Sequence, residues 1–354
     1  MPTFARSDGT SSRIGGVPTE DEVRDRRARA IVFKAPRQVE VEPVDVPSPG
    51  DGDVLVRTLW SGISAGSEML AYRGEIDAAL PLDETISALA GRFTFPFRYG
   101  YSCVGRVESS RSDIADGQLV FAFHPHQDLF AIGSEDVVVL GDVDPRLATL
   151  FPLVETALQA ALDAGPVLEE VVVVTGFGAV GILTGLMLQR AGARVLGVEP
   201  LADRRAVAAT VGLEAVGPEQ AAGLLAGRGR TGVGLLVEAS GSPEVLRDVL
   251  GLLDHEGEAL VVSWYGAKEA RLRLGAEFHR RRLHIRSTQV SSIPAALSGR
   301  WPRARRRAVV CELLRELPLA PLATHSFPFD RVGEAFAAVD RRDPGLLHVA
   351  LCYT

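Results

Sequence analysis

The sequence predicts an α/β protein in which a doubly wound parallel sheet is inserted into a β-rich domain. Three observations predict it: strand-like segments dominate up to about residue 140, strands and helices alternate from about residue 151 to 288, and the chain closes on another strand-like segment. A chain of 354 residues is long for a single hydrophobic core, so two folded domains are expected.

The first part of the chain predicts a flexible arm followed by a barrel-like domain. Residues 1–27 are polar and charged without an apolar run, which is typical of an arm and not of a secretory signal. Short runs rich in β-branched residues follow, divided by Pro, Gly and Asp: ARAIVFKA from Ala28, QVEVEPVDV from Gln38 and DVLVRTLWSG from Asp53. One short helix is expected near Ile76–Ala90.

The middle part predicts the parallel sheet. FPLVETALQAALDAG, from Phe151 to Gly165, has helical spacing and ends in a Gly-Pro stop. Alternating elements follow: strands at Val171–Val174, Arg194–Val198, Gly234–Ala239 and Glu258–Ser263, and helices at Ala179–Ala191, Asp203–Val211 and Pro243–Leu253. Such alternation predicts right-handed crossovers between parallel strands.

The last part is expected to return to the β-rich domain. A strand is expected at His284–Val290, helices at Arg303–Leu317 and Arg331–Asp340, and a closing strand in HVALCY from His348. The expected divisions are an arm at 1–27, a β-rich domain at 28–152 with 289–354, and an inserted domain at 153–288.

Charge and composition exclude several classes of partner. The net charge of −7 argues against a nucleic-acid partner, which needs a dominant basic surface. The basic runs His279–Arg282, Arg303 and Arg305–Arg307 are expected to be solvated faces. No apolar run reaches the length of a membrane span, so the protein is expected to be cytoplasmic.

The cysteines predict neither a zinc lobe nor a disulfide framework. Cys103, Cys311 and Cys352 are far apart, and no pair has CxxC spacing. We expect reduced, structural thiols.

A dinucleotide-binding motif opens the inserted domain. The expected strand at Val171–Val174 and Thr175 run directly into Gly176-Phe177-Gly178-Ala179-Val180-Gly181, which opens an expected helix. The first glycine permits a tight turn, the second lets the backbone approach a pyrophosphate, and the third allows close packing of helix on strand. The free N–H groups of the helix N-terminus would face the phosphates.

The next expected strand ends in a carboxylate that bears on the choice of cofactor. Glu199 follows Gly181 by 18 residues, where a carboxylate can accept hydrogen bonds from the adenosine ribose hydroxyls. That favours NAD(H). Arg204 and Arg205 come shortly after and could instead hold a 2′-phosphate, so NADP(H) stays open.

The order of parts resembles the medium-chain dehydrogenase/reductase superfamily over about Ala28 to Tyr353. Ser61–Glu68 resembles the loop that carries the first zinc-ligand cysteine, Tyr99–Val107 the Gly-His-Glu loop, and Asp116–Phe121 the Gly-Asp-Arg-Val turn. The resemblance implies a Rossmann domain inserted in a GroES-like catalytic domain, a small-molecule substrate and a homodimer.

The same loops depart from the family at the zinc ligands. Ser64 stands in place of the cysteine, Tyr101 in place of the histidine and Ser102 in place of the glutamate, and the four-cysteine lobe is missing. Hydroxyls are not usual zinc ligands, so we expect no metal site. Glu155 lies in a third-ligand region, and a zinc hypothesis built on it with His124-Pro125-His126 is weak.

Within the superfamily, three segments resemble the subgroup of bacteriochlorophyllide hydroxyethyl dehydrogenases: SGISAGSE, the GYS loop and Ser263-Trp264-Tyr265-Gly266. The resemblance implies oxidation of a secondary alcohol or reduction of its ketone. By resemblance Trp264 and Tyr265, with Gln289 and Val290, lie beside the nicotinamide. Further cofactor-binding candidates are Ser240 and Ser263.

Without zinc, a side chain must hydrogen-bond or protonate the substrate oxygen. Tyr101 is the first candidate, and Ser64 and Ser67 could orient the oxygen or relay a proton. The titratable alternatives are Glu68, Glu155 and His124.

An aromatic series occupies every second position at Phe93, Phe95, Phe97, Tyr99 and Tyr101. It predicts either an apolar wall for a large substrate or a core face of the barrel. Pro96 and Gly100 argue against one continuous strand.

Three functions follow in order of preference. The first is a zinc-independent NAD(P)-dependent alcohol dehydrogenase or ketone reductase acting on a bulky apolar biosynthetic substrate. The second is an NADPH-dependent quinone or enoyl reductase acting on an activated C=C bond. The third is a non-catalytic NAD(P)-binding protein.

Overall fold

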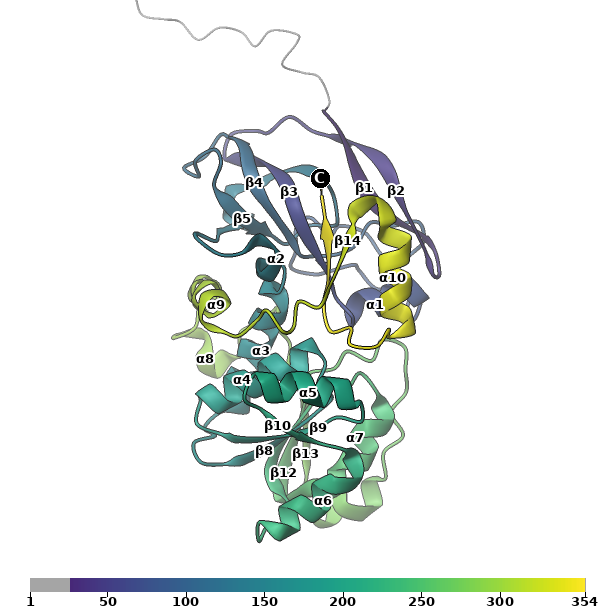
Figure 1. The fold of residues 1–354 in the computed structure, drawn as a ribbon, viewed down its shortest axis with the longest axis vertical. Helices are drawn as coiled ribbons and strands as arrows, with labels where there is room; N and C mark the ends of the chain where they lie inside the picture. The colour runs from purple at the N-terminus through teal and green to yellow at the C-terminus, as the bar shows by residue number, and fades with distance from the viewer. Residues whose placement is uncertain (1–25, 354) are drawn as a thin grey trace, which may run out of the picture.

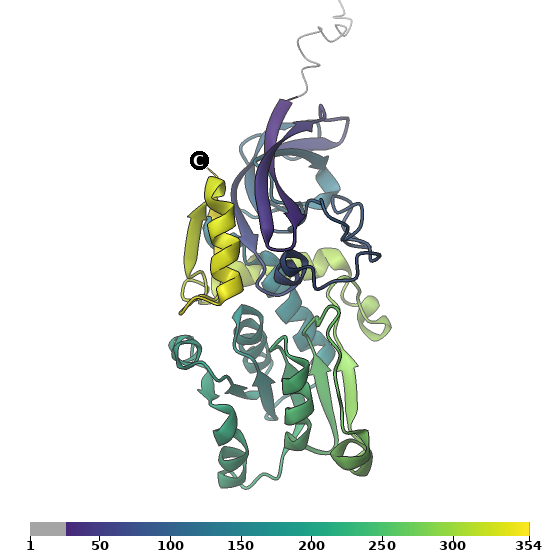
Figure 2. The same ribbon diagram turned by 90° about the vertical axis from the view of Figure 1, so that its right-hand side faces the viewer.

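The computed structural model describes residues 26–353, and its two larger β-sheets lie one beyond the other along the long axis of the molecule (Figures 1 and 2). No helix within these residues is long and apolar enough to cross a membrane. The expected arm falls outside the described residues except for Arg26 and Arg27, which belong to the first strand.

A seven-stranded sheet forms the β-rich half. Its strands are β3 (Asp53–Ile63), β4 (Cys103–Ser110), β5 (Leu119–Ala122), β6 (Leu129–Gly133), β7 (Val137–Val139), β14 (His325–Pro328) and β15 (Val349–Cys352). The order is β14-β15-β3-β4-β5-β7, with β6 also on β3. Because β15 pairs antiparallel with β3, from Val349 opposite Ile63 to Cys352 opposite Trp60, the end of the chain returns to the first half.

A separate hairpin of β1 (Arg26–Ala35) and β2 (Gln38–Val46) lies beside this sheet. It is joined to the rest by the N–H of Ile31, which donates to the carbonyl of His126 at 2.9 Å, and by the N–H of Phe33, which donates to the carbonyl of Phe97 at 2.8 Å.

The other half is built on a six-stranded sheet in which every neighbouring pair is parallel. Its strands are β8 (Val171–Thr175), β9 (Arg194–Val198), β10 (Glu214–Val216), β11 (Val233–Glu238), β12 (Leu253–Val261) and β13 (His284–Ser287), in the order β10-β9-β8-β11-β12-β13. From β8 the chain adds β9 and β10 toward one edge of the sheet, and then returns to add β11, β12 and β13 toward the other edge. The switch point lies between β8 and β11. Ligands of such sheets bind at this switch point, outside the carboxyl ends of the strands.

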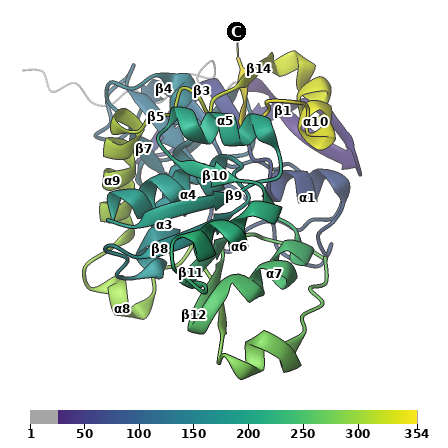
Figure 3. The same cartoon turned by 60° about the horizontal axis from the view of Figure 1, so that its bottom comes forward.

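Helices cover both faces of the parallel sheet (Figure 3). Those on one face are α4 (Ala179–Arg190) and α5 (Ala202–Thr210), and those on the other are α6 (Pro218–Gly227) and α7 (Pro243–Val249). The strand valines supply both cores by alternation: Val172 and Val174 pack on the α4 side, Val171 and Val173 on the α6 side. This two-sided burial explains the continuous apolar run in the sequence.

The two halves share one core. The shared cluster includes Phe121 of β5, Phe151 of α3 (Phe151–Ala164), Val172 of β8 and Val310 of α9 (Arg303–Glu316). Helix α3 packs against both α4 and α9 and so links the sheets. The remaining helices are α1 (Ser67–Arg73), α2 (Pro145–Ala148), α8 (Ala295–Ser298) and α10 (Val332–Arg341).

Four expected elements are wrong or shifted. No helix forms at Ile76–Ala90, where Asp77 and Asp83 instead accept local backbone N–H bonds that compete with a helix. The strand expected at His284–Val290 ends at Ser287, because its partner β12 ends at Val261, opposite that residue. Strand β12 begins five residues before the expected Glu258, and α7 ends at Val249, before the expected Leu253.

The expectation that the whole Arg303–Arg307 run is solvated is also wrong. Arg306 has only 2% of its surface exposed and pairs with the buried Glu155, its Nε lying 3.0 Å from Oε1. Its guanidinium also donates to Gln159 Oε1 at 2.6 Å. The reason is that this face of α9 packs against α3, where an arginine can be buried only with partners.

Candidate active site

A small cavity lies at the expected catalytic position, in the β-rich half beside the start of α3. The residues that line it are Gly62, Ser64, Tyr101, Ser102, Thr149, Pro152, Leu153 and His348. They come from the end of β3 and the loop after it, the loop before β4, the segment after α2, the start of α3 and the residue before β15. Segments almost 300 residues apart in the chain therefore meet here.

Tyr101 and two serines form a hydroxyl cluster at this cavity. The Tyr101 Oη lies 2.7 Å from Ser67 Oγ, and Ser67 Oγ donates to Ser64 Oγ at 3.4 Å. Helix α1 begins at Ser67 after Gly66, which places Ser67 at the edge of the cluster. Burial, aided by the nearby Glu68 carboxylate, raises the pKa of Tyr101 to about 12, so the phenol keeps its proton at neutral pH.

Glu68 lies behind this cluster in a fully buried pair with His126. Its Oε2 is 2.8 Å from His126 Nε2, and its Oε1 accepts from the N–H of Ser64 at 3.0 Å. On its other side, His126 Nδ1 lies 2.7 Å from Ser61 Oγ, which is 2.9 Å from Tyr353 Oη. Glu68 thus holds the Ser64 loop in place.

His126 was not among the predicted site residues. The signal that could have found it is the HxH motif combined with Gly100. That glycine has a φ of +103°, and a Cβ on it would lie 2.4 Å from the His126 ring. A glycine in this position indicates that a bulky group packs directly on the backbone.

The structure does not bring His124 to the cavity. Its ring stacks on Phe130 with centroids 3.8 Å apart, and its Nδ1 lies 2.8 Å from the carbonyl oxygen of Pro125. On an extended chain residues two apart would face the same side, but here only His126 meets Glu68, whereas His124 lies on Phe130. His126, and not His124, is the histidine that is linked to the hydroxyl cluster, through Glu68.

Glu155 is likewise not part of the cavity. It belongs to the buried pair with Arg306 between α3 and α9, and Pro152 and Leu153 are the α3 residues that face the site. The expected third-ligand region thus presents apolar side chains, and Glu155 is a structural partner of an arginine.

The glycine-rich loop has the geometry of a phosphate cradle at the switch point. Gly176 has a φ of +82°, and a Cβ there would lie 2.4 Å from the Cα of Ser240, at the end of β11. A Cβ on Gly181 would lie 1.9 Å from the carbonyl oxygen of Gly176. At Gly178, which precedes α4, a Cβ would meet no atom nearer than Arg204 Nη1 at 4.0 Å.

Phe177, Ala179 and Val180 complete this loop and its helix. Phe177 is fully buried, with its ring against Gly197 of β9, and Ala179 and Val180 begin α4 without a side-chain cap. The first N–H groups of α4 are therefore available to an anion beside the open face of Gly178.

Glu199 lies at the end of β9 and is 2% exposed. Its Oε2 accepts from the N–H of Phe177 at 2.7 Å and its Oε1 from the N–H of Leu201 at 2.9 Å. Arg204 Nη1 lies 3.9 Å from the same carboxylate, whereas Arg205 Nη1 donates to the carbonyls of Glu199 and Pro200. Each carboxylate oxygen keeps one lone pair for a further donor.

Glu238 was not among the predicted site residues. It lies at the centre of a hydrogen-bond network that includes Ser240, Ser263 and Tyr265. This fully buried carboxylate at the end of β11 accepts from the N–H of Ser240 at 2.7 Å, from Ser240 Oγ and from Tyr265 Oη at 2.6 Å. Burial against this carboxylate raises the pKa of Tyr265 above its usual range. The N–H of Gly241 donates to Ser263 Oγ at 2.8 Å. The network fixes the backbone beside the glycine-rich loop.

Trp264 stands at the junction between the two halves. Its ring lies 6.2 Å from that of Phe93, it is 44% exposed, and the N–H of Ala267 donates to the carbonyl of Glu75 at 2.9 Å. Gln289 and Val290 lie beyond the end of β13, where Gln289 Oε1 accepts from the N–H of Ser291 at 3.2 Å. They are therefore loop residues and not strand residues.

The aromatic series is mainly core. Phe93, Phe97 and Tyr99 are each less than 9% exposed and pack with Phe33 and Phe336, whereas Phe95 and Tyr101 are partly exposed. The segment is not a continuous strand, as Pro96 and Gly100 predicted. The core-face interpretation is thus confirmed for the three buried rings.

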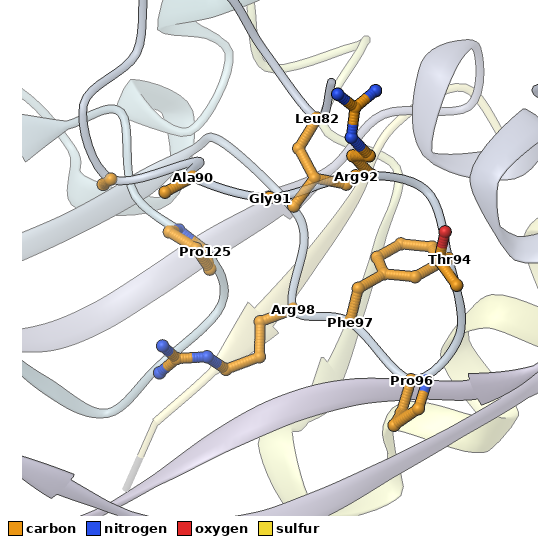
Figure 4. Close-up of a pocket in the computed structure, with 10 residues that line it drawn as sticks. Leu82, Ala90, Gly91, Arg92, Thr94, Pro96, Phe97, Arg98 and Pro125 are labelled. Carbon is orange, nitrogen blue, oxygen red and sulfur yellow. The ribbon is translucent and has the colours of Figure 1, made fainter. Parts of the chain in front are cut away.

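A larger cavity of about 540 Å³ is lined partly by this aromatic segment (Figure 4). Its lining is Leu82, Ala88, Ala90, Gly91, Arg92, Thr94, Pro96, Phe97, Arg98 and Pro125. It shares no lining residue with the Tyr101 cavity, so it is a separate surface feature.

Comparisons with known proteins agree with this geometry. Residues 179–308 match the family model described as zinc-binding dehydrogenase. The chain is 25% identical to the 2-desacetyl-2-hydroxyethyl bacteriochlorophyllide A dehydrogenase of Cereibacter sphaeroides, over 92% of this chain and 98% of that protein. The chain is thus an oxidoreductase enzyme similar to zinc-binding dehydrogenases, whose family model it matches over residues 179–308.

Two solved structures show the same fold as this dehydrogenase. An Escherichia coli CFT073 protein described as a short chain alcohol dehydrogenase, complexed with NADH, has a TM-score of 0.73 at 16% identity, covering 92% of this chain and 99% of that one. A Sinorhizobium meliloti 1021 protein bound to NADP has a TM-score of 0.73 at 18% identity, covering 93% and 100%. The Rossmann and GroES-like architecture is thereby confirmed.

The side chains of this dehydrogenase do not fit a zinc ion. The expected ligand positions hold Ser64, Tyr101 and Ser102, and Ser102 Oγ donates to the carbonyl of Thr149 at 2.7 Å. Among residues 26–353, no group of three or more His, Cys, Asp or Glu side chains is placed to hold a metal. Zinc takes thiolate, imidazole and carboxylate ligands, which this cavity lacks apart from the single imidazole of His348.

Because two of its histidines are buried, we expect acid to lower the stability of the folded protein. Burial lowers the pKa of His124 to about 4 and that of His348 to about 3, whereas an unfolded histidine titrates near about 6.5. Below that value the unfolded chain binds protons that the folded chain does not, so the free energy of unfolding falls as the pH falls. Each histidine contributes about 2 kcal/mol of this loss between pH 7 and 5.

Urea unfolding at pH 7, 6 and 5 measures this loss, and the His348→Gln variant serves as the control because it removes one titrating group. Its free energy of unfolding should fall less steeply with acid than that of the unaltered protein. A free energy of unfolding that is unchanged or higher at pH 5 would contradict the assignment.

Proposed function

We propose that this dehydrogenase is zinc-independent and transfers hydride between a nicotinamide cofactor and a secondary alcohol or its ketone, with Tyr101 as the hydrogen-bond and proton donor to the substrate oxygen. One observation carries the proposal: the hydroxyls of Tyr101 and Ser64, which stand where the resemblance expects two of the metal ligands, are joined through Ser67 in one cluster. The relative named for a hydroxyethyl substrate supports the alcohol class.

The cofactor would lie along the carboxyl ends of β8 and β11. The open face at Gly178 and the free N–H groups of α4 fit a pyrophosphate, and Glu199 would accept hydrogen bonds from ribose hydroxyls with its remaining lone pairs. When bound, the nicotinamide supplies or accepts the hydride. The residues of this chain then have to orient the substrate and supply the proton.

Tyr101 suits the donor role because its phenol stays protonated. A ketone oxygen gains negative charge as hydride arrives, and a hydrogen bond from the Tyr101 Oη stabilises that charge. A phenol with a pKa of about 12 is still a stronger acid than an aliphatic alcohol, so the proton moves from Tyr101 to the new alkoxide. Ser67, 2.7 Å away, can hold the remaining phenolate once its single hydroxyl proton turns from Ser64 Oγ to the Tyr101 oxygen.

Metal analysis of the purified protein tests zinc independence. We expect less than about 0.1 zinc per chain and full activity in the presence of a chelator. Stoichiometric zinc, or activity lost to a chelator and restored by zinc, would contradict the proposal.

The position of Glu199 supports NAD(H) as the preferred cofactor, because a 2′-phosphate beside its carboxylate would be repelled. We expect NADH to bind at least about tenfold more tightly than NADPH in titration calorimetry. Arg204→Ala is the matched variant, since its guanidinium is the nearest cation to Gly178. It should weaken NADPH binding more than NADH binding.

The same arginine supports a second candidate function. If NADPH binds more tightly than NADH and the Arg204→Ala variant loses that preference, reduction of an activated C=C bond becomes the better assignment. Product analysis on an enone separates the two functions, because one yields the allylic alcohol and the other the saturated ketone.

A bulky apolar substrate is still proposed, but fewer aromatic residues support it than the sequence suggested. Phe93 and Tyr99 are buried in the core, and Phe97 reaches the surface only at the separate larger cavity, so these rings offer no wall to a substrate at the Tyr101 cavity. The apolar surface that supports this substrate class is Trp264, 44% exposed at the junction of the two halves, and the partly exposed Phe95.

A further inference from the structure

Glu238 is a buried carboxylate beside the phosphate cradle. It ends β11 opposite Thr175 of β8, the residue directly before the glycine-rich loop, and it is fully buried. Farther along the same chain, Ser240 lies so close to Gly176 that a Cβ on the glycine would meet its Cα at 2.4 Å. Glu238 therefore lies at the switch point of the sheet, where the cofactor is expected.

The same carboxylate connects the cradle with the junction between the two halves. Its Oε2 accepts from Tyr265 Oη at 2.6 Å, and Tyr265 directly follows Trp264 at that junction. In the same loop, Gly266 packs on the β-rich half, since a Cβ there would lie 2.4 Å from the carbonyl oxygen of Glu75. A nicotinamide that exchanges hydride with a substrate at the Tyr101 cavity has to lie between the cradle and the β-rich half. Glu238 is bonded to the loop that joins these two parts.

The surroundings of Glu238 favour its ionised form. The N–H and the hydroxyl of Ser240 both donate to Oε1, the first of them at 2.7 Å, and Tyr265 supplies the donor to Oε2. Donors directed at both oxygens stabilise the charged form of a carboxyl group. Because the group is buried, salt and water screen this charge far less than they would at the surface.

No cation neutralises this charge in the part of the chain that the structure describes. Within residues 26–353 no Lys, Arg or His side chain lies within ion-pair distance of Glu238, whereas the buried Glu155 pairs with Arg306 at 3.0 Å. Lys268 reaches the neighbouring carbonyl of Gly241, but its side chain is exposed and its Nζ lies 3.9 Å from another carboxylate. A buried charge without a cationic partner is costly, so the site gains most from a ligand that brings positive charge.

We propose that the buried charge of Glu238 makes the cofactor site prefer the oxidised nicotinamide, whose ring is cationic, over the reduced one, whose ring is neutral. The inference rests on the nicotinamide cofactor of the proposed function, and not on its substrate or its lack of zinc. Attraction between charges acts over distance, so Glu238 needs no contact with the ring. The preference favours the direction in which an alcohol enters and a ketone leaves.

Titration calorimetry of the cofactor-free protein with NAD⁺ and with NADH tests the proposal without any turnover. We expect the unaltered protein to bind NAD⁺ at least as tightly as NADH. Glu238→Gln removes the charge and keeps the shape of the side chain. It should weaken NAD⁺ binding about fivefold and change NADH binding less than about twofold. If the protein prefers the phosphorylated cofactor, the same comparison is made with NADP⁺ and NADPH.

Two further variants separate charge from shape. Glu238→Asp keeps the charge but shortens the side chain that Ser240 and Tyr265 hold. The ratio of the two affinities should therefore stay within about twofold of that of the unaltered protein, even where both affinities fall. Glu244→Gln is the matched control outside the network. Its carboxylate is exposed in the first turn of α7, where water and salt screen it, so the ratio should not change.

Tighter binding of NADH than of NAD⁺ by the unaltered protein, or an equal effect of Glu238→Gln on both, would overturn the inference and leave the proposed function standing. A larger change of the ratio in Glu238→Asp than in Glu238→Gln would show that Glu238 only shapes the loop, and would overturn it too. Binding of neither form would overturn the proposed function as well. Thermal unfolding shows whether each variant is folded, and the comparison on the unaltered protein needs no variant.

Discussion

Tyr101→Phe is expected to lower kcat/KM by at least about 100-fold for alcohol oxidation and ketone reduction alike. The substitution removes one oxygen and leaves the ring, which packs 6.1 Å from Tyr99 between centroids. The loss falls on the transition state, where charge develops on the substrate oxygen, so kcat should fall more than KM changes. Steady-state kinetics in both directions measure this.

Ser67→Ala is the matched control for the hydroxyl cluster. It removes the partner that lies 2.7 Å from the Tyr101 Oη and keeps the phenol itself, so we expect a loss of about tenfold or less. Unchanged kcat/KM in the Tyr101→Phe variant would remove Tyr101 from the mechanism. The fold and the family would stand.

We expect Gly181→Ala to lower the stability of the protein and Gly178→Ala to weaken the binding of the cofactor. A Cβ at position 181 would lie 1.9 Å from the backbone oxygen of Gly176, which has no room to move without shifting the whole turn. We expect Gly181→Ala to destabilise the protein by about 3 kcal/mol. Urea unfolding without cofactor measures the loss.

At position 178 the added methyl meets no atom within van der Waals distance in the free protein. Gly178→Ala should therefore change the free energy of unfolding by about 1 kcal/mol or less. It should weaken NADH binding about tenfold or more, because the methyl would occupy the space through which a pyrophosphate approaches the backbone. NADH binding as tight as in the unaltered protein would place the phosphates elsewhere.

Local chemistry accounts for what could be predicted. The valine run of β8, the glycines at 176, 178 and 181 and the helix after them lie within about 20 consecutive residues, so their spacing alone predicts the strand, turn and helix. The alternation of such units also predicts a parallel sheet, since crossovers are short and right-handed. The expected helix at Ile76–Ala90 fails for a local reason too, because two aspartates satisfy the backbone in turns.

The candidate site was only partly predictable, because its contacts join distant parts of the chain. Glu68 reaches His126 across 58 residues, Glu155 reaches Arg306 across 151, and Thr149 reaches His348 across 199. No spacing rule links such pairs. The sequence predicts Tyr101, Ser64 and Ser67 because they lie in two loops with family resemblance. It does not show which of His124 and His126 lies near Glu68.

By itself, then, the sequence determined the α/β class, the glycine-rich loop and the hydroxyl residues that stand where metal ligands would be expected. The tertiary structure alone decided which buried groups line the cavity and which pair with a partner away from it, as Glu155 does with Arg306. The physical reason is the cost of burying polar groups: each buried carboxylate or imidazole adopts the position where it finds a partner. Among the groups at the Tyr101 cavity, His348 Nδ1 is the buried atom without one.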